Sequence, residues 1–355
     1  KASFNNNVDE IFFSALRKKG LQSSNIVHSD KVGFGRIHNT IHRFYRSSVI
    51  SILKKRNFDL YMNEKVKFFF NDRKNRKVVV KTDKRVFYSD YIILSAGVIG
   101  TYNLLLDSQE RLGKINNSLG EFIKDHTNLR VNVLTKGNIG SLNEIDQSIF
   151  KKIHIFLKHS IGLPSIMRGT GATSGVHLDL DNDGVVDTRI QIVQFSEKGR
   201  HGSDGTFFNK EPGFSLSITP VRPRSFGKIM KSKNKITINP NYLSANSDII
   251  LLKKALKFSL NLLKSEPFNE VIKEILEEDF ITSNPTQYIR ENIYSGHHLI
   301  GGSSKLINSD LSLKSMPEAF ICDASVFSDY ASSNIHSSVI LLSDMFAKNF
   351  INKFY

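Results

Sequence analysis

The spacing of apolar residues changes its period along the chain, and each change predicts a different kind of element. Helical spacing predicts helices over residues 8–21 and 39–56. Between residues 58 and 94 the apolar residues alternate with polar ones or form short runs between polar turns, which predicts a strand over 58–63 and then an antiparallel meander. The last run, residues 91–94, is apolar throughout, as in a strand buried on both faces.

The middle of the chain has a different pattern of apolar and polar residues. Short strand-like segments lie between glycine-rich and polar loops over residues 130–240, which predicts a mostly antiparallel sheet. Helical periodicity over 246–264 and 268–278 predicts two helices on one side of this sheet. From residue 319 the pattern returns to a buried strand, a polar loop and an amphipathic helix.

Residues 91–108 join a strand, a glycine-bearing turn and a helix. This succession is the elementary unit of a nucleotide-binding α/β sheet. We therefore expect a mixed α/β fold in which this unit belongs to a partial Rossmann-like domain. The middle of the chain is expected to form a separate, mostly antiparallel sheet with helices on one side.

Composition changes this picture little. The hydrophobic fraction of 40% and the charged fraction of 23% are ordinary for a water-soluble globular protein. The net charge of +15 comes from scattered Lys and Arg, so we interpret it as a compositional bias that attracts anionic substrates mildly, not as a nucleic-acid interface. A single cysteine, Cys322, excludes an intramolecular disulfide and a Cys-based zinc site. No apolar run approaches the ~20 residues of a transmembrane helix.

Two segments carry candidate chemistry. Residues 329–336 (DYASSNIH) lead into the last predicted helix, and Ser337 and Ser338 stand at its start, where backbone N–H groups favour an anion. Residues 296–302 (GHHLIGG) place two histidines between glycines, which supplies an imidazole that titrates near neutral pH. From the residues alone, an ordinary capped helix is the favoured interpretation of the first segment. For the second segment, metal ligation, a general base and plain surface histidines are all open.

Five segments, including these two, occur in a specific order. They are SAGVIGTYNLLLDS (95–108), LGEFIKDHT (119–127), SFGKIMKSKNKITINPNYLSANSD (225–248), HLIGG (298–302) and DASVFSDYASSN (323–334). This succession resembles the C-terminal portion of the glucose–methanol–choline (GMC) oxidoreductases, and it covers the chain from about residue 40. One such segment gives modest support for the resemblance, whereas five segments in the same order make it specific.

The resemblance implies an FAD-dependent oxidoreductase that oxidises a CH–OH group of a sugar, polyol or other alcohol by hydride transfer to flavin N5. It places the handling of the hydroxyl proton on His298 and Asn334, with His297 and His336 as second candidates. It also makes residues 1–130 and 293–355 the FAD-binding domain and residues 131–292 the substrate-binding domain. The implied cofactor contacts are Val66, Ala96, Gly97, Asp323, Ala324, Asn334, Ile335 and His336.

The family's N-terminal G-x-G-x-x-G unit has no counterpart in this sequence. Neither GFGRIHNT (33–40) nor GTGATSG (169–175) has a strand before it and a helix after it. Together with Lys1 as the first residue, this predicts a fragment without the front of its FAD domain, inactive by itself. No signal peptide is visible, so a cytoplasmic location is slightly favoured.

Two alternatives to the sugar or polyol enzyme stay open. One is a sterol-type alcohol oxidase of the same family, because H-x-x-G-G with a partner Asn also resembles cholesterol oxidases. The other is a non-catalytic, truncated remnant that acts as a binding protein. The sequence identifies neither the substrate nor the electron acceptor.

A further motif, DLDNDGVVD (179–187), lies outside the family pattern. Its spacing matches the first nine positions of a calcium-binding loop, but Ile190 takes the place of the bidentate Glu. A plain Asp-Gly hairpin turn is the alternative. The four candidate Ca²⁺ ligands are Asp179, Asp181, Asp183 and Asp187.

Overall fold

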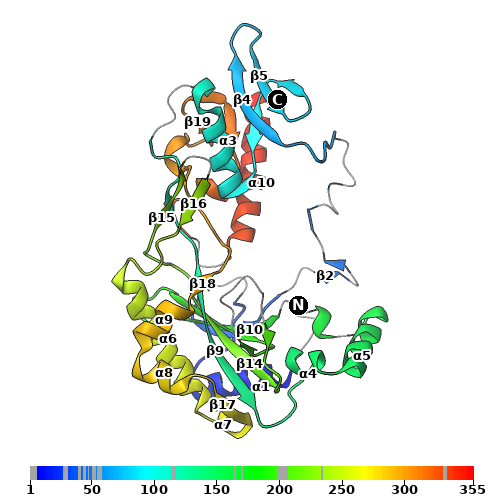
Figure 1. The fold of residues 1–355 in the computed structure, drawn as a ribbon, viewed down its shortest axis with the longest axis vertical. Helices are drawn as coiled ribbons and strands as arrows, with labels where there is room; N and C mark the ends of the chain where they lie inside the picture. The colour runs from blue at the N-terminus through cyan, green and yellow to red at the C-terminus, as the bar shows by residue number, and fades with distance from the viewer. Residues whose placement is uncertain are drawn as a thin grey trace. The chain divides into compact units, whose positions relative to one another are not determined.

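The computed structural model describes residues 6–26, 31–38, 41–42, 45–46, 48–49, 53, 58–112, 117–163, 165–168, 171–198, 207–232, 235–330 and 334–355. The chain divides into two compact units, each built from three segments (Figure 1). Unit 1 comprises Lys1–Asn57, Thr127–Val221 and Asn246–Tyr294, and unit 2 comprises Phe58–His126, Arg222–Ala245 and Ser295–Tyr355.

The expected mixed α/β fold is confirmed, but the division differs from the expected bounds in two places. The first 57 residues belong with the middle of the chain, in unit 1. Residues 222–245 belong with the chain ends, in unit 2.

Unit 1 is built on the predicted antiparallel sheet, which has seven strands. Six follow one another across the sheet, and the seventh, β18 (Tyr294–Ser295), also pairs with β9. The order of the six is β1 (Gly33–Arg36), β10 (Ala172–Leu178), β11 (Thr188–Val193), β14 (Gly213–Pro220), β9 (Thr127–Thr135) and β17 (Ile272–Ile275). Two short ribbons accompany it: β2 (Ile41–His42) with β3 (Tyr45–Arg46), and β12 (Glu197–Lys198) with β13 (Phe207–Phe208).

The two faces of this sheet differ in polarity. Paired side chains share a face, so Val131, Leu216 and Ile192 form part of an apolar face. Residues one position along each strand, such as Arg130 and Ser217, lie on the opposite, polar face.

Helices cover the apolar face of the sheet. Phe13 stacks on Phe34, with ring centroids 5.2 Å apart, and Phe268 stacks on Phe214 at 5.5 Å. The helices of unit 1 whose bounds lie within the described residues are α1 (Asn7–Lys18), α4 (Leu142–Asp146), α5 (Ile149–Ser160), α6 (Asn246–Leu263), α7 (Phe268–Val271), α8 (Glu278–Ser283) and α9 (Pro285–Asn292), with a 3₁₀ turn at Ile166–Arg168.

Unit 2 contains three small sheets. The predicted meander is formed by β4 (Val66–Asp72), β5 (Lys77–Thr82) and β6 (Val86–Ser89). In the second sheet, β7 (Ile92–Leu94) is parallel to β20 (Met316–Ile321), which pairs with β19 (Ser312–Leu313). The third is β16 (Lys235–Asn239), β15 (Gly227–Ser232) and β8 (Glu121–Ile123). The helices are α3 (Gly97–Leu112) and α10 (Ile335–Phe354), with 3₁₀ turns at Ser304–Leu306 and Ala324–Val326.

Several local expectations are wrong. In the predicted helix over 39–56, residues 41–42 and 45–46 are strands, Val49 and Leu53 are helical, and most of the remainder lies outside the described residues. Residues 58–63 form no strand. Strand β7 is not buried on both faces, because Ile93 is 47% exposed.

The middle of the chain contains two further departures. The predicted helix over 268–278 stops at Val271, because residues 272–275 pair with the edge of β9 as strand β17. Tertiary pairing overrides helical periodicity in this β-branched segment. Helices α4 and α5 interrupt a region that was expected to consist of strands. Across the described residues, no helix combines the length and apolar content needed to span a bilayer.

Asp310 attaches the end of α10 to the β19 region of unit 2. Its Oδ1 accepts the hydroxyl of Ser312 at 2.6 Å, and its Oδ2 accepts the ammonium of Lys353 at 2.9 Å. The bond from Ser312, followed by that from Lys353, lowers the pKa of Asp310 from 3.8 to about 2. The carboxylate therefore contributes stability above pH 3.8, and this contribution is lost as the pH falls through about 2.

We expect Asp310→Asn to reduce the free energy of unfolding by about 1 kcal/mol at pH 6, a value discounted because the carboxylate is partly solvent-exposed. Urea unfolding of both proteins at pH 6 and pH 2 measures the difference, which should disappear at pH 2. Asp344→Asn, which removes an exposed i,i+4 pair with Lys348, is the matched control. An equal loss at both pH values would show that the charge of Asp310 is not what stabilises the contact.

Candidate functional site

A buried carboxylate in unit 2 holds the segment that carries the two predicted histidines. Asp125 lies just after β8 and is 5% exposed. Its Oδ1 accepts the backbone N–H of His298 at 2.8 Å. Its Oδ2 accepts the hydroxyls of Tyr242 and Ser295, both at 2.5 Å. The Ser295 oxygen in turn accepts the backbone N–H of His297 at 3.0 Å, so the backbone is fixed at both histidines.

A second histidine, His126, faces His298. Their Nδ1 atoms lie 3.1 Å apart, and the two rings are nearly perpendicular. The fully buried His126 stacks on Tyr330 at 3.9 Å, and the Tyr330 hydroxyl donates to the carbonyl oxygen of His298 at 2.9 Å. A hydrogen bond between two Nδ1 atoms requires one ring to donate and the other to accept. Proton exchange between His298 and another molecule would therefore use Nε2.

The two tyrosines around Asp125 remain protonated donors. Burial raises the pKa of Tyr242 above its ordinary value, and the hydrogen bond to Asp125 raises it further. Burial and then the charge of Asp125 likewise raise the pKa of Tyr330. Both phenols therefore keep their protons at neutral and mildly alkaline pH, so Tyr242 remains a donor to Asp125 and Tyr330 a donor to the carbonyl oxygen of His298.

Two glycines place the histidine turn between β8 and the 3₁₀ turn after β20. The N–H of Gly301 donates to the carbonyl oxygen of Ala324 at 3.0 Å, and the carbonyl of Gly302 accepts the N–H of Gly120 at 2.8 Å. Gly301 has φ +86°, and a Cβ there would lie 2.3 Å from the carbonyl oxygen of Phe122. Both the backbone conformation and the close approach therefore require glycine.

Gly301→Ala is expected to lower the free energy of unfolding by about 3 kcal/mol, because the methyl group must displace backbone atoms in addition to adopting a positive φ. Gly20→Ala is the matched control: Gly20 has φ +81° and no atom within 4 Å of its Cβ position. Its expected loss is about 1 kcal/mol, from the backbone conformation alone. Denaturant unfolding measures both, and equal losses would contradict the packing argument.

The carboxyl ends of the parallel strands β7 and β20 meet at one edge of their sheet, where Leu94 pairs with Ile321. Asp323, which is buried, joins the segments that follow them. It accepts the N–H of Gly97 at 3.0 Å and the hydroxyl of Thr101 at 2.5 Å. Asp323 therefore ties the start of α3 to the segment after β20.

This edge fits the approach of a dinucleotide. In open α/β sheets, ligands lie beyond the carboxyl ends of the strands and near a helix N-terminus. Gly97, the first residue of α3, has φ +73° and no atom within 4 Å of its Cβ position, and the neighbouring Ala96 is exposed. The residues predicted to contact FAD at Ala96, Gly97, Asp323 and Ala324 thus come together in unit 2, around open space at a helix start.

The remaining predicted residues have different surroundings. Asn334 is the exposed N-cap residue of α10, and His336 is exposed in its first turn. Leu299 and Ile335, which neighbour His298 and Asn334 in sequence, pack against the same hydrophobic cluster, so both segments meet in one part of unit 2. Val66 begins β4, at the edge of the meander. The catalytic and cofactor roles of these residues stay predictions.

Sequence reasoning missed Asp125, His126, Tyr242 and Tyr330 as members of the site. Each lies inside one of the five family-like segments, which were compared as patterns without a role for these positions. A polar or aromatic side chain within such a segment is the signal that could have found them. Their convergence on His298 depends on contacts between distant parts of the chain.

The aspartate motif at 179–187 forms the loop between β10 and β11. The Asp179 carboxylate accepts the N–H groups of Asp183 and Gly184, and Asp187 accepts those of Leu180 and Asp181. Asp181 pairs with Lys254 at 2.7 Å. Among the described residues, which include this loop, no three His, Cys, Asp or Glu side chains are arranged to hold a metal ion. The carboxylates of Asp179 and Asp187 bind the backbone of the turn, as the alternative of a plain Asp-Gly hairpin requires, and Ca²⁺ binding at this loop stays a prediction.

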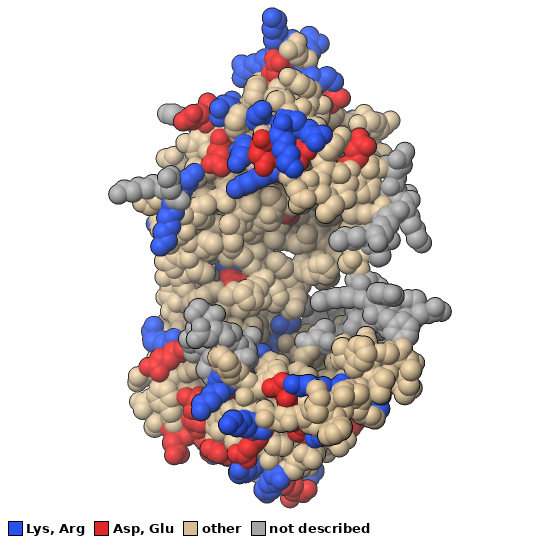
Figure 2. All heavy atoms as spheres, turned by 45° about the vertical axis from the view of Figure 1, so that its right-hand side comes forward, with Lys and Arg blue, Asp and Glu red and all other residues tan. Residues whose placement is uncertain are grey.

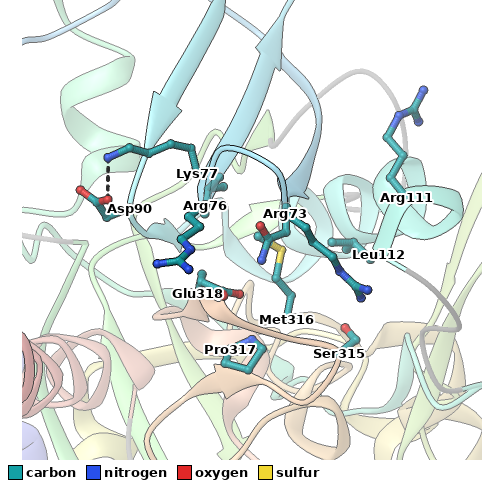
Figure 3. Close-up of a pocket in the computed structure, with 12 residues that line it drawn as sticks. Arg73, Arg76, Lys77, Asp90, Arg111, Leu112, Ser315, Met316, Pro317 and Glu318 are labelled. Atoms are coloured by element: carbon teal, nitrogen blue, oxygen red, sulfur yellow. Dashed lines mark hydrogen bonds and ion pairs between the residues drawn. The ribbon is translucent and has the colours of Figure 1, made fainter.

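Unit 2 also has a basic pocket, with a volume of about 500 Å³ (Figure 3). It lies between the β4–β5 hairpin, the end of α3 and the start of β20, and it includes Arg73, Arg76 and Arg111. Lys77 pairs with Asp90 there at 2.7 Å. None of the histidines of the candidate site lines this pocket, so it is a local source of attraction for anions that is distinct from that site.

Comparison with known proteins agrees with the predicted resemblance. Residues 223–343 match the family model described as GMC oxidoreductase. "Neither inactivation nor afterpotential protein G" of Drosophila melanogaster is 25% identical over 158 residues, which cover 38% of this chain and 27% of that protein. The chain therefore spans about a quarter of the length of this curated relative.

Solved structures show the same fold. Formate oxidase of Aspergillus oryzae superposes with a TM-score of 0.81 at 18% identity, covering 96% of this chain and 69% of that one. An FAD-dependent oxidoreductase from Chaetomium thermophilum superposes with a TM-score of 0.80 at 12% identity, covering 98% of this chain and 72% of that one. A fungal aryl-alcohol oxidase superposes with a TM-score of 0.78 at 14% identity, covering 96% of this chain and 70% of that one. Residues 223–343 therefore match the GMC oxidoreductase family directly, and the chain as a whole has the fold of these solved structures.

Proposed function

We propose that the protein is an FAD-dependent oxidoreductase that oxidises the CH–OH group of a sugar, polyol or other alcohol. Similar solved proteins are named formate oxidase, aryl-alcohol oxidase and FAD-dependent oxidoreductase, which supports redox chemistry on small oxygenated molecules. The open glycine and helix start at Gly97, with Ala96, Asp323 and Ala324, would hold part of the FAD. FAD, when bound, supplies the acceptor for the hydride that leaves the carbinol carbon.

The protein's own part is to hold and move the hydroxyl proton. His298 is proposed to take up this proton at Nε2, since its Nδ1 faces His126. Asn334 would donate a hydrogen bond to the oxygen as negative charge develops on it. Asp125 and Tyr330 fix the backbone of His298 on both sides, through its N–H and its carbonyl oxygen, so the ring is oriented before the substrate arrives.

One observation carries this proposal above all: a histidine whose N–H, carbonyl oxygen and ring nitrogen are all held by buried groups. A surface histidine has no need of such support. Positions whose rotamer and backbone are fixed by several buried partners are typical of residues that must face a reacting atom.

The test is an anaerobic titration of the FAD-loaded full-length protein with sugars, polyols, aryl alcohols and sterols. We expect the absorbance bands of the oxidised flavin to be bleached by at least one sugar or polyol. Bleaching by sterols alone would favour the sterol-type alternative. A holoenzyme with stoichiometric FAD that none of these donors reduces would refute the proposal.

A further inference from the structure

Helix α5 turns its apolar side toward solvent. None of its twelve residues is buried, although half of them are large and apolar. Five large side chains are between 51% and 80% exposed. These five are Ile149, Phe150, Ile153, Phe156 and Leu157.

The exposed side chains form one continuous face of the helix. At about 100° per residue, the five fall within an arc of about 120°. The opposite side, with Ile155, Lys158 and His159, is half-buried. The apolar face continues beyond the helix through Ile161, Leu163 and Met167, which are 47% to 70% exposed. A helix on a soluble domain normally buries its apolar face, so the amphipathicity of α5 is inverted.

The charges beside this face have one dominant sign. From Gln147 to Leu178 the sequence contains no acidic residue, whereas Lys151, Lys152, Lys158 and Arg168 are basic. Lys151 contacts the buried Glu144 at 3.3 Å. Lys152 contacts Asp146 at 2.9 Å, and this pair is weak because both side chains are 47% exposed. Figure 2, which turns the side of Figure 1 that carries α5 toward the viewer, shows a tan surface there with blue Lys and Arg beside it.

Aromatic and aliphatic side chains on one face, with lysines on the others and no acidic side chain, are typical of helices that lie in the surface of an anionic membrane. A contiguous apolar surface of this kind marks an interaction site, since monomeric proteins rarely leave it in water. The lysines complement phosphate head groups, and they do not complement a second copy of the same basic helix. Charge therefore favours a lipid surface over self-association.

We propose that α5 and the turn that follows it dock unit 1 on an anionic lipid surface. The helix lies parallel to the membrane, with Phe150 and Phe156 among the upper acyl chains and the exposed Lys152, at the edge of the apolar face, at the phosphates. Attachment is peripheral, through one face of a short helix. The proposal concerns a surface of unit 1 and does not depend on the redox chemistry of unit 2.

The experiment is co-sedimentation of the full 355-residue chain with vesicles of phosphatidylcholine, with and without 30 mol% phosphatidylserine. We expect binding to the anionic vesicles that is at least tenfold stronger than to the neutral ones and that weakens as salt is added. The double variant Phe150→Ser/Phe156→Ser should lose at least tenfold in partition. Lys152→Glu should weaken binding to anionic vesicles and leave the weak binding to neutral ones unchanged.

A matched control distinguishes α5 from exposed apolar residues elsewhere. Leu341 and Met345 of α10 are 59% and 55% exposed, so Leu341→Ser/Met345→Ser removes a similar apolar area from unit 2 and should keep vesicle binding. Equal binding of wild type and the α5 double variant would overturn the proposal, as would equal loss in the α10 control. The wild type could instead fail to bind vesicles and form a dimer in analytical ultracentrifugation, while the α5 double variant stays monomeric. This result would assign the apolar face to contact with a second copy of the chain. Unchanged circular dichroism confirms that the variants fold.

Discussion

Replacing His298 with alanine should slow substrate-dependent flavin reduction in the holoenzyme by about 10² to 10⁴-fold, the usual contribution of a positioned general base. The imidazole is half-buried and its backbone is held by buried partners, so its loss removes a proton acceptor without opening the core. FAD content should stay unchanged, because the predicted dinucleotide contacts lie at the ends of β7 and β20. Stopped-flow absorbance under anaerobic conditions measures the rate.

The neighbouring histidine provides the control for this experiment. His297 is exposed, has φ +58° and is held only through its backbone N–H, so His297→Ala should change the rate by less than about threefold. If His297→Ala abolishes reduction while His298→Ala does not, the two roles must be exchanged. If neither variant changes the rate, the imidazole does not take part in the reaction.

Asp125→Ala should reduce the free energy of unfolding by about 3 to 5 kcal/mol, because it leaves three buried donors without their acceptor. These donors are the hydroxyls of Tyr242 and Ser295 and the backbone N–H of His298. The carboxylate belongs to the segment after β8, whereas its donors come from two distant parts of the chain. Its loss therefore disconnects the histidine turn, and the rate of flavin reduction should fall together with stability.

Denaturant unfolding measures this loss, and two variants test its origin. Asp125→Asn keeps an oxygen acceptor, so its free energy of unfolding should fall by about half as much as that of Asp125→Ala. Asp329→Ala removes a carboxylate that is 58% exposed and pairs with Lys124, so it should cost no more than about 1 kcal/mol. A similar loss for Asp125→Ala and Asp329→Ala would mean that the buried hydrogen bonds do not stabilise the site.

Much of the fold could be predicted from the sequence because local patterns determine it. The alternation of apolar and polar residues over 66–89 predicts the meander, and the helical periodicity over 246–264 predicts α6. The segments around Gly97 and Gly301 were recognised because only glycine suits their backbones, and such positions leave a trace in a sequence motif.

The rest depends on contacts that a single segment does not encode. Residues 272–275 have a helical spacing of apolar residues, but the free edge of β9 makes them a strand. Asp125 and His126 stand in a motif that gives no sign of Tyr242 or Tyr330 as partners. The scattered Lys and Arg behind the net charge of +15 indicate only a compositional bias, and the sequence does not show that α5 turns its apolar face outward.

The parallel pairing of β7 with β20 has a consequence for synthesis on the ribosome. Ser95, at the end of β7, bonds to the carbonyl oxygen of Cys322, which follows 227 residues later. At translation rates of roughly 5 to 20 residues per second, β7 waits about 10 to 45 s for this partner. Meanwhile the exposed strand edge and apolar side chains of β7 and α3 are available to chaperones or to other nascent chains. Unit 2 therefore stays incomplete while these 227 residues are synthesised, and a stop codon just before β20 would release a chain that cannot complete it.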